Sequence, residues 1–289
     1  MTSHRPEQVG PADVFYNERE AEKYTVNTRM INIQTQLTLR ALEILAIPRG
    51  KQKMLLDIGC GSGISGNILG TKGHMWMGMD ISKAMLKVAV DREVEGDVIH
   101  CDMGHGFGFR DGSFDGAVSI SALQWLCSAE QAVQNPFKRL NKFFASLYAC
   151  LIKGARCAFQ FYPSSPEQVE MITSAAMRNG FTGGLIVDFP NSKKARKYFL
   201  FLMAGYSEQI IKEAEEAVFL PKARTDGEDY DFNDEDGDDS DMEDCDSDDE
   251  ENKEDGEAEG DESDDDDDGF KKKDRTIKQV GRRRDSKAI

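Results

Sequence analysis

The stretch from Met54 to Gly66 reads MLLDIGCGSGISG, and it constrains the fold of this chain more than any other segment. An apolar run ends in an acid, and four glycines follow it at close spacing. Glycine has no Cβ, so a turn of this composition lets a ligand approach the backbone closely. A strand that enters such a turn and continues as a helix is typical of nucleotide-type cofactor sites in open α/β sheets.

Two registers of the motif fit this stretch. Residues Gly61 to Gly66 match the dinucleotide pattern G-x-G-x-x-G, while Asp57 to Gly63 match the D-x-G-x-G-x-G of S-adenosylmethionine (SAM) enzymes. A carboxylate just before the turn would repel the pyrophosphate of a dinucleotide. SAM has no phosphate and carries two cations, an ammonium and a sulfonium, which favour a nearby anion. We therefore predict a SAM site that includes Asp57, Gly59, Cys60, Gly61 and Gly63.

Two further acids fall at the ends of the next two predicted strands. Asp80 closes the run from His74, about twenty residues past the turn, where a carboxylate can accept both ribose hydroxyls. Asp102, followed by Met103, is placed to meet the adenine amino group. The predicted cofactor site therefore extends to Asp80 with its neighbour Ile81, and to Asp102 with Met103.

Strand and helix patterns alternate along the chain, which implies a parallel sheet covered by helices on both faces. The last two predicted strands, Leu185–Phe189 and Tyr198–Met203, have no helix between them, so we expect an antiparallel hairpin at one edge. The predicted fold is a Rossmann-like class I SAM methyltransferase with a seven-stranded, mostly parallel sheet in the order 3-2-1-4-5-7-6. The helices are predicted at Thr28–Leu45, from Ile64, after Ser82, at Pro136–Ile152 and at Pro166–Asn179; the other strands begin at Met54, His74, Asp97, Phe114 and Ala155.

Charge separates one domain from a tail. Residues 226–268 hold 28 acids and one lysine, residues 269–289 hold nine basic and two acidic residues, and the whole chain carries −17. Residues 1–225 are therefore near neutral at +3, and the pI of 4.7 reflects the tail. A block so acidic cannot bury a core, and we predict that it is disordered. The acidic block either has a binding role or is a solvated spacer with no role beyond solubility. The basic residues 269–289 indicate a nuclear-import signal or an RNA-binding arm.

We divide the chain into five predicted parts. Residues 1–50 form an N-terminal helical segment that covers the cofactor site, and 51–205 form the methyltransferase core. Residues 206–225 are a short helix and linker, with a helical run at Glu208–Phe219, followed by the acidic tail and the basic segment. No run of about 18 apolar residues and no apolar leader occurs, so we expect neither a membrane span nor a secretory signal. The six cysteines form no C-x-x-C pair, and the histidines lack metal spacing, so no metal site is predicted.

Over roughly residues 5–205 the chain resembles the SAM-dependent methyltransferases that modify N7 of a guanine in 18S ribosomal RNA and assist ribosome assembly. Ser119–Ala122 with Gln124–Cys127, and Val187–Ser192, match patterns specific to that family. The acidic block, and His105 with Phe107–Phe109, depart from it. Further matching segments are Arg5–Glu7, Phe15–Tyr16, Glu22–Tyr24, Asn27–Met30, Leu55–Gly61, Gly78–Ser82, Val90–Glu93, Glu95–Asp97, Asp102–Gly104 and Lys142–Leu147.

The resemblance assigns roles to several residues. Guanine N7 has an available lone pair, so no general base is required, and Gln124 and Trp125 are expected to position the purine by hydrogen bonding and stacking. Tyr24 and Arg29 are expected to cover the cofactor, and Ser119 to contact it. The alternatives are that Trp125 is a core aromatic, that Tyr24 and Arg29 lie on a surface helix, and that Ser119 is simply a small residue at a strand end.

The resemblance also implies partners. They are 18S rRNA within a pre-40S particle, and a small zinc-binding activator subunit that adds a strand to the edge strand Val98–Asp102. It implies a nuclear location, in nucleolus and nucleoplasm, with the cytoplasm left open. Two other readings compete with an rRNA methyltransferase: an assembly factor whose methyltransferase fold is mainly a binding scaffold, and a small-molecule methyltransferase.

Overall fold

The computed structural model describes residues 5–127, 135–192, 194–205 and 222–225. The predicted run Glu208–Phe219, the acidic block and the basic segment lie outside these residues. Within the described part, seven strands form one sheet in the order β3-β2-β1-β4-β5-β7-β6. Strands β1 to β5 pair in parallel, and β7 runs antiparallel to both β5 and β6. The predicted fold class, strand order and edge hairpin are confirmed.

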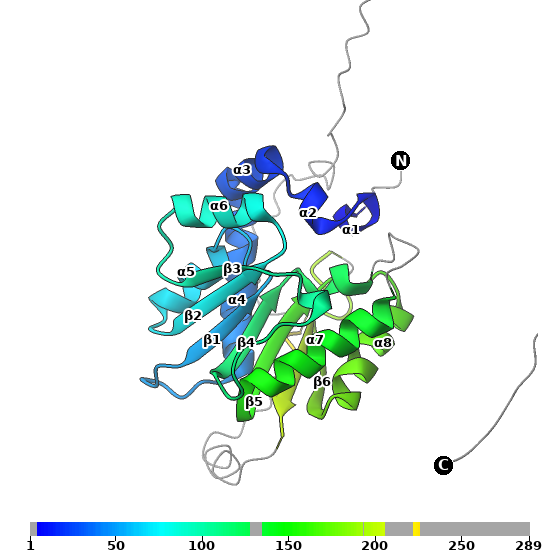
Figure 1. Ribbon diagram of the computed structural model, residues 1–289. Helices are drawn as coiled ribbons and strands as arrows, with labels where there is room; N and C mark the ends of the chain where they lie inside the picture. Colours follow the sequence, from blue (N-terminus) through cyan, green and yellow to red (C-terminus); the bar gives the residue numbers. More distant parts are fainter. Residues whose placement is uncertain (1–4, 128–134, 193, 206–221, 226–289) are drawn as a thin grey trace, which may run out of the picture. The chain divides into compact units, whose positions relative to one another are not determined.

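The element bounds define the labels of Figure 1. The strands are β1 (Met54–Ile58), β2 (Met75–Asp80), β3 (Asp97–His100), β4 (Phe114–Ile120), β5 (Leu151–Phe161), β6 (Phe181–Asp188) and β7 (Lys197–Ala204). The helices are α1 (Pro6–Val9), α2 (Ala12–Phe15), α3 (Glu18–Val26), α4 (Thr28–Leu45), α5 (Ile64–Thr71), α6 (Lys83–Asp91), α7 (Pro136–Cys150) and α8 (Pro166–Arg178), with short 3-10 helices η1 (Met103–His105) and η2 (Leu123–Cys127).

Local signals explain most helix starts. Side chains of Asn27, Ser82, Asn135 and Ser165 each accept a hydrogen bond from a backbone N–H in the first turn of α4, α6, α7 and α8. Some predicted bounds were wrong. Helix α7 ends at Cys150 because β5 begins at Leu151, four residues before the predicted start. Strand β6 begins at Phe181, before the predicted start at Leu185. Gly183 and Gly184 weaken the strand pattern in the sequence, but both pair with residues of β7.

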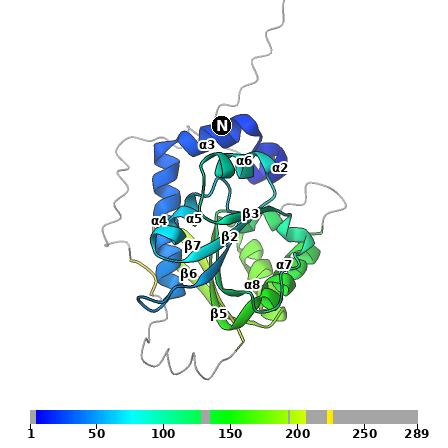
Figure 2. The ribbon, with the colours of Figure 1, turned by 60° about the vertical axis from the view of Figure 1, so that its left-hand side comes forward.

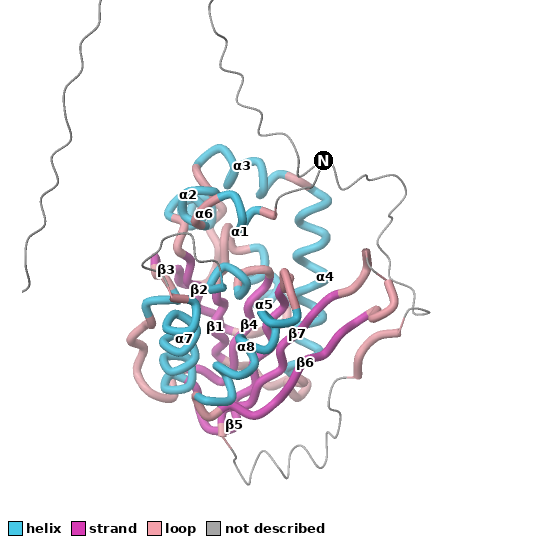
Figure 3. Tube along the Cα trace, turned by 90° about the vertical axis from the view of Figure 1, so that its right-hand side faces the viewer, coloured by secondary structure: helices cyan, strands magenta, loops and turns pink. Residues whose placement is uncertain are grey.

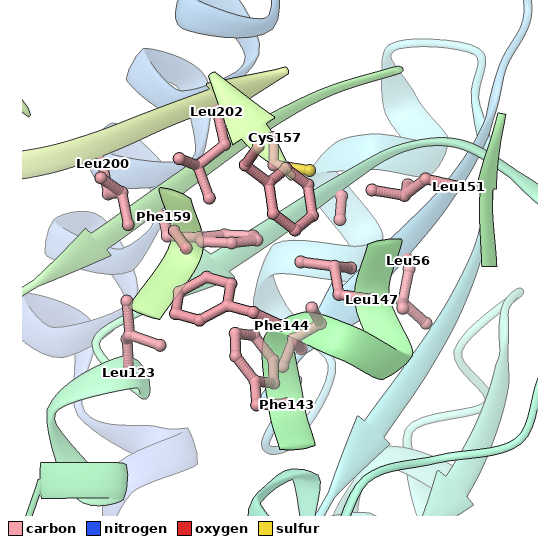
Figure 4. Packing of buried hydrophobic residues seen from close by; sticks show 14 of the residues in the cluster. Leu56, Leu123, Phe143, Phe144, Leu147, Leu151, Cys157, Phe159, Leu200 and Leu202 are labelled. Atoms are coloured by element: carbon pink, nitrogen blue, oxygen red, sulfur yellow. The ribbon is translucent and has the colours of Figure 1, made fainter. Parts of the chain in front are cut away.

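The sheet is covered on both faces. On one face, Leu56 of β1 and Phe159 of β5 pack with Phe143, Phe144 and Leu147 of α7 (Figure 4). On the other face, Leu55 of β1 packs in a second cluster with residues of α4 and α5. Figures 2 and 3 show α4 on the face opposite α7 and α8. Because neighbouring residues of a strand point to opposite faces, this arrangement buries both sides of β1.

The short helices α1 to α3 lie above the carboxyl ends of the central strands (Figure 1). In the part of the chain that the structure describes, no helix is long and apolar enough to cross a membrane. The five cysteines within this part are free thiols.

Candidate active site

A cavity of about 440 Å³ lies at the carboxyl ends of β1, β2 and β4, beneath α2 and α3. This volume is within the range of sites for small molecules and cofactors. Of the residues predicted from the sequence, the cavity is lined by Tyr24, Gly59, Gly61, Asp80, Ile81, Asp102, Met103 and Trp125. Five separate segments of the sequence therefore meet at one end of the sheet.

The glycine loop between β1 and α5 forms one wall of this cavity. Gly59, Gly61 and Gly63 all have positive φ, at 73°, 53° and 80°. The N–H groups of Gly59 and Cys60 donate to the Met79 carbonyl oxygen at 2.8 and 3.1 Å, which ties the loop to β2. A Cβ at position 59 would collide with the side chain of Ala122, so the loop and the end of β4 approach closely only because this residue is glycine.

Asp80 joins the glycine loop to the start of α6. Its Oδ2 accepts the Gly61 N–H at 2.9 Å, and its Oδ1 accepts the Ser82 N–H at 2.8 Å. Burial raises the pKa of this carboxyl group, and the backbone hydrogen bonds oppose the shift. Each carboxylate oxygen has a second lone pair, so Asp80 can still accept hydroxyl groups from a ligand. The residue thus fixes the loop and presents an acceptor to the cavity.

Asp57 lies behind the glycine loop and does not line the cavity. Its side chain is fully buried, and its Oδ2 accepts the hydroxyl of Ser65 at 2.6 Å. Burial raises the pKa of Asp57 to about 7, the hydrogen bond from Ser65 opposes this shift, and the nearby Asp80 adds to it. This placement differs from the direct ligand contact expected from the sequence. Asp57 acts on the cavity through Ser65, which does line it.

Other predicted residues also lie away from the cavity surface. Cys60 packs beneath Gly78, and Gly63 is the N-cap residue that precedes α5. Ser119 is fully buried and donates to the Ile58 carbonyl oxygen at 2.8 Å, so it ties β4 to β1. Gln124 is buried and donates to the Ser121 carbonyl oxygen at 2.9 Å. Arg29 is exposed in the first turn of α4.

The adenine side of the predicted site contains two residues that the sequence did not point to. Asp102 accepts the Gly104 N–H at 2.8 Å and Nη2 of Arg139 at 3.0 Å, and Nδ1 of His105 lies 3.2 Å from its other oxygen. Arg139 and His105 both line the cavity. Arg139 comes from α7, more than thirty residues later in the chain, and no spacing in the sequence links it to Asp102.

Residues 5–16, here called the strap, cross the mouth of the cavity. Arg5 donates to the carbonyl oxygens of Tyr162 and Pro163 at 3.2 and 3.0 Å, and Ser82 donates its hydroxyl to the Tyr16 carbonyl oxygen at 2.7 Å. The Trp125 ring lies 6.2 Å from that of Phe15 and 6.0 Å from that of Tyr16, centre to centre. The strap thus contacts Ser82 and Trp125, and it includes Pro11 to Val14, which line the cavity.

The residues of this cavity fit SAM. A glycine loop open to the backbone suits the methionyl part, Asp80 suits a ribose, and Ile81 and Met103 supply apolar contacts beside an adenine. Burial raises the pKa of Tyr16 and of Tyr24, so both phenols stay neutral over the cavity. Within the described ranges, no three His, Cys, Asp or Glu side chains are grouped as metal ligands.

Comparisons with known proteins agree with this geometry. A family model described as a methyltransferase domain matches residues 56–159. The 18S rRNA (guanine-N(7))-methyltransferase of Mus musculus is 52% identical over 229 residues, covering 79% of this chain and 78% of that protein. The probable 18S rRNA (guanine-N(7))-methyltransferase of Dictyostelium discoideum is also 52% identical, over 233 residues, covering 80% of this chain and 78% of that protein.

Among solved structures, the fold is similar to magnesium protoporphyrin IX methyltransferase from Synechocystis, crystallised with bound SAM. The TM-score is 0.51 at 15% identity, over 71% of this chain and all of that chain. At this identity the likeness supports the fold alone.

Proposed function

The chain belongs to the family of 18S rRNA (guanine-N7)-methyltransferases, and from this membership we propose that it methylates N7 of a guanine in 18S rRNA during small-subunit biogenesis. The observation that carries the proposal is the 52% identity over 229 residues, a span that covers 78% of the mouse relative. Identity at this level over most of both chains supports the same reaction for this chain.

We propose that Asp80 binds the ribose of SAM, that Asp102 and Met103 meet its adenine, and that the backbone of Gly59 and Gly61 meets its methionyl part. When bound, SAM supplies an electrophilic methyl group that is transferred by direct displacement. The chain's own contribution is orientation and exclusion of water, because displacement requires donor and acceptor to be in line. Asp57, with a pKa of about 7, becomes negatively charged behind the loop as the pH rises through this value, and that charge favours a cationic ligand.

The acceptor nitrogen needs no proton removed, so the residues beside it act by placement. Trp125 lines the cavity next to the cofactor loop and is half-buried under the strap. We propose that the guanine stacks on this ring after part of the strap moves, and that Gln124 orients Trp125 through Ser121. Stacking of an unpaired base on an aromatic side chain is the usual mode of RNA recognition.

The test is to map N7-methylguanine in 18S rRNA from cells that contain the wild-type chain, an Asp80→Lys chain or no chain. Loss of one methylated guanine both on deletion and with Asp80→Lys supports the proposal. Growth then separates an enzyme from an assembly factor: normal growth of Asp80→Lys beside a growth defect of the deletion assigns the essential role to binding. A methylation map that is unchanged by deletion would refute the proposed activity.

We also propose a small zinc-binding activator subunit as a partner at the β3 edge, where the family resemblance expects one. Strand β3 pairs with β2 and with no other described strand, and it carries no Lys or Pro. Two apolar side chains are exposed here, Ile99 of β3 at 37% and Val90 of the neighbouring α6 at 62%. An edge of this kind is a template for strand addition. The paired strand ends at His100, so Cys101 and Asp102 of the predicted edge strand follow it as a loop.

Co-expression tests this partner. Ile99→Lys or His100→Pro should abolish the complex, while Val26→Lys, at an exposed valine of α3, should leave it intact. A soluble, fully active chain obtained without any partner would contradict the proposal.

We further propose a nuclear location, in nucleolus and nucleoplasm, directed by residues 269–289; a reporter fused to this segment should enter the nucleus.

A further inference from the structure

We propose that Gln160, a β5 residue that does not touch the cavity, is a positioning residue that holds Ser121 in a left-handed turn and thereby places Trp125 for the acceptor base. The role assigned to Trp125 rests on the proposed function. The arrangement of Gln160 and Ser121 rests on the geometry of the described residues.

Ser121 follows the last residue of β4 and has an unfavourable backbone conformation. Its φ is 57°, in the left-handed region, which is unfavourable for a residue with a Cβ. Such a conformation persists where surrounding contacts hold it, and it occurs most often at functional sites. The contacts that hold Ser121 therefore identify the residues on which the shape of the cavity near Ser121 depends.

Gln160 supplies those contacts. Its side-chain Oε1 accepts both the N–H of Ser121 at 3.0 Å and the hydroxyl of Ser121 at 2.8 Å. Its backbone carbonyl oxygen also accepts the Ser121 N–H at 3.0 Å. Gln160 is fully buried and pairs with Ile120 in the sheet, so its side chain has little freedom to follow Ser121 elsewhere.

The turn stands between the cofactor loop and Trp125. Ser121 and Ala122 line the cavity, and the Ala122 side chain lies directly against Gly59. On the other side, the Ser121 carbonyl oxygen accepts Nε2 of Gln124, and the next residue is Trp125. A change in the Ser121 backbone therefore moves Ala122, beside the cofactor loop, relative to Trp125, beside the proposed acceptor base.

Because of this geometry, loss of Gln160 should affect methyl transfer and SAM binding differently. The ribose acceptor Asp80 is fixed by Gly61 and Ser82, which do not contact Gln160 by any hydrogen bond among the described residues. Loss of Gln160 should therefore leave SAM affinity nearly unchanged. Methyl transfer depends on alignment within about 1 Å, so kcat should fall.

The experiment uses the full chain with Gln160→Met, which keeps the side-chain volume and removes the acceptor. We expect kcat for 18S rRNA methylation to fall about tenfold or more, with the SAM Kd within about twofold. Adding Ser121→Gly should restore kcat, because glycine adopts positive φ without being held there. The matched control is Gln168→Met, at a buried glutamine of α8 whose Oε1 accepts the N–H of Ser164, just before the helix; it should lower Tm without lowering kcat.

A second readout does not depend on activity. The chain has two tryptophans, so subtracting the emission of a Trp125→Phe variant leaves that of Trp125. We expect Gln160→Met to shift Trp125 emission to longer wavelength and Ser121→Gly to reverse the shift. An unchanged emission, or a loss of kcat that Ser121→Gly does not restore, would overturn the proposal. A wild-type chain that methylates no guanine would refute the proposed function and leave the emission test of Gln160 intact.

Discussion

The floor and the cover of the cavity are built in different ways. The floor, made of Gly59, Gly61 and Asp80, lies at strand ends and is fixed by backbone hydrogen bonds to the sheet. The cover is the strap, which is held by the exposed Arg5, by the Ser82 hydroxyl and by ring contacts to Trp125. The contrast indicates that the sheet preorganises the cofactor site, while side-chain contacts outside the sheet hold the cover in place.

The largest effect should come from the floor. Asp80→Ala removes the acceptor for two ribose hydroxyls, and each hydrogen bond to a charged group contributes about 1.5–3 kcal/mol. The SAM Kd should then rise by more than about a hundredfold in calorimetric titration. Asp91→Ala, an exposed carboxylate at the end of α6, should leave it unchanged. An Asp80→Ala chain that binds SAM normally would remove the distinction between floor and cover.

The buried acid beneath the floor should make stability depend on pH. The pKa of Asp57 is about 7 in the folded chain and about 3.8 when unfolded, so between these values the unfolded state releases a proton that the folded state keeps. The stabilising contribution is fully present below pH 4 and is lost as the pH rises to about 7, by at most about 4 kcal/mol. Urea unfolding of the SAM-free protein at several pH values should show this fall, and Asp57→Asn should flatten it. Identical pH profiles for the two proteins would contradict the assignment.

Trp125, in η2, lines the cavity and contacts the cover, so its replacement sharpens the comparison. Trp125→Ala removes a stacking surface worth about 1–3 kcal/mol per base. The kcat/KM for 18S rRNA should fall by about ten- to a hundredfold, while SAM affinity changes little because the floor is intact. Trp125→Phe should recover much of the loss. If SAM affinity falls as far as kcat/KM, the ring serves the cofactor more than the base.

The smallest effect should come from the cover itself. Phe15→Ala removes ring contacts with Tyr16 and Trp125, and an aromatic pair contributes about 0.5–1.5 kcal/mol. SAM should dissociate about three- to tenfold faster in stopped-flow measurements, with a nearly unchanged Tm. Val9→Ala, in the strap but with an exposed side chain, is the matched control. A large drop in Tm would mean that the strap is part of the core.

The floor could be predicted from the sequence because its residues are tied to strand ends. Gly61, Asp80 and Asp102 follow three apolar runs, and parallel strands bring their carboxyl ends to one edge. Helix α4 was predicted to the residue, since its apolar periodicity is long and Asn27 caps it. The position of Asp57 behind the loop was not predictable, because the motif fixes its place in the chain and not the direction in which its side chain is buried.

The cover could not be predicted for physical reasons. Helices α1 and α2 have four residues each, which is too short for a periodic pattern. Their contacts are with distant segments: Phe15 of α2 lies against the Trp125 ring, and Arg5, just before α1, donates to the carbonyl oxygens of Tyr162 and Pro163. The turn at Ser121 gave no signal either, since serine is not a residue that marks positive φ. Both features depend on contacts between segments distant in the sequence.

The most direct test of the account is methyl transfer to 18S rRNA whose guanosines are replaced by 7-deazaguanosine. This base keeps its Watson–Crick face and has a C–H group in place of N7. With labelled SAM and the full chain, bound to its activator subunit where that is needed, we predict incorporation into ordinary 18S rRNA and none into the deaza form. Equal incorporation into both RNAs would show that the methyl group goes elsewhere and would contradict the account.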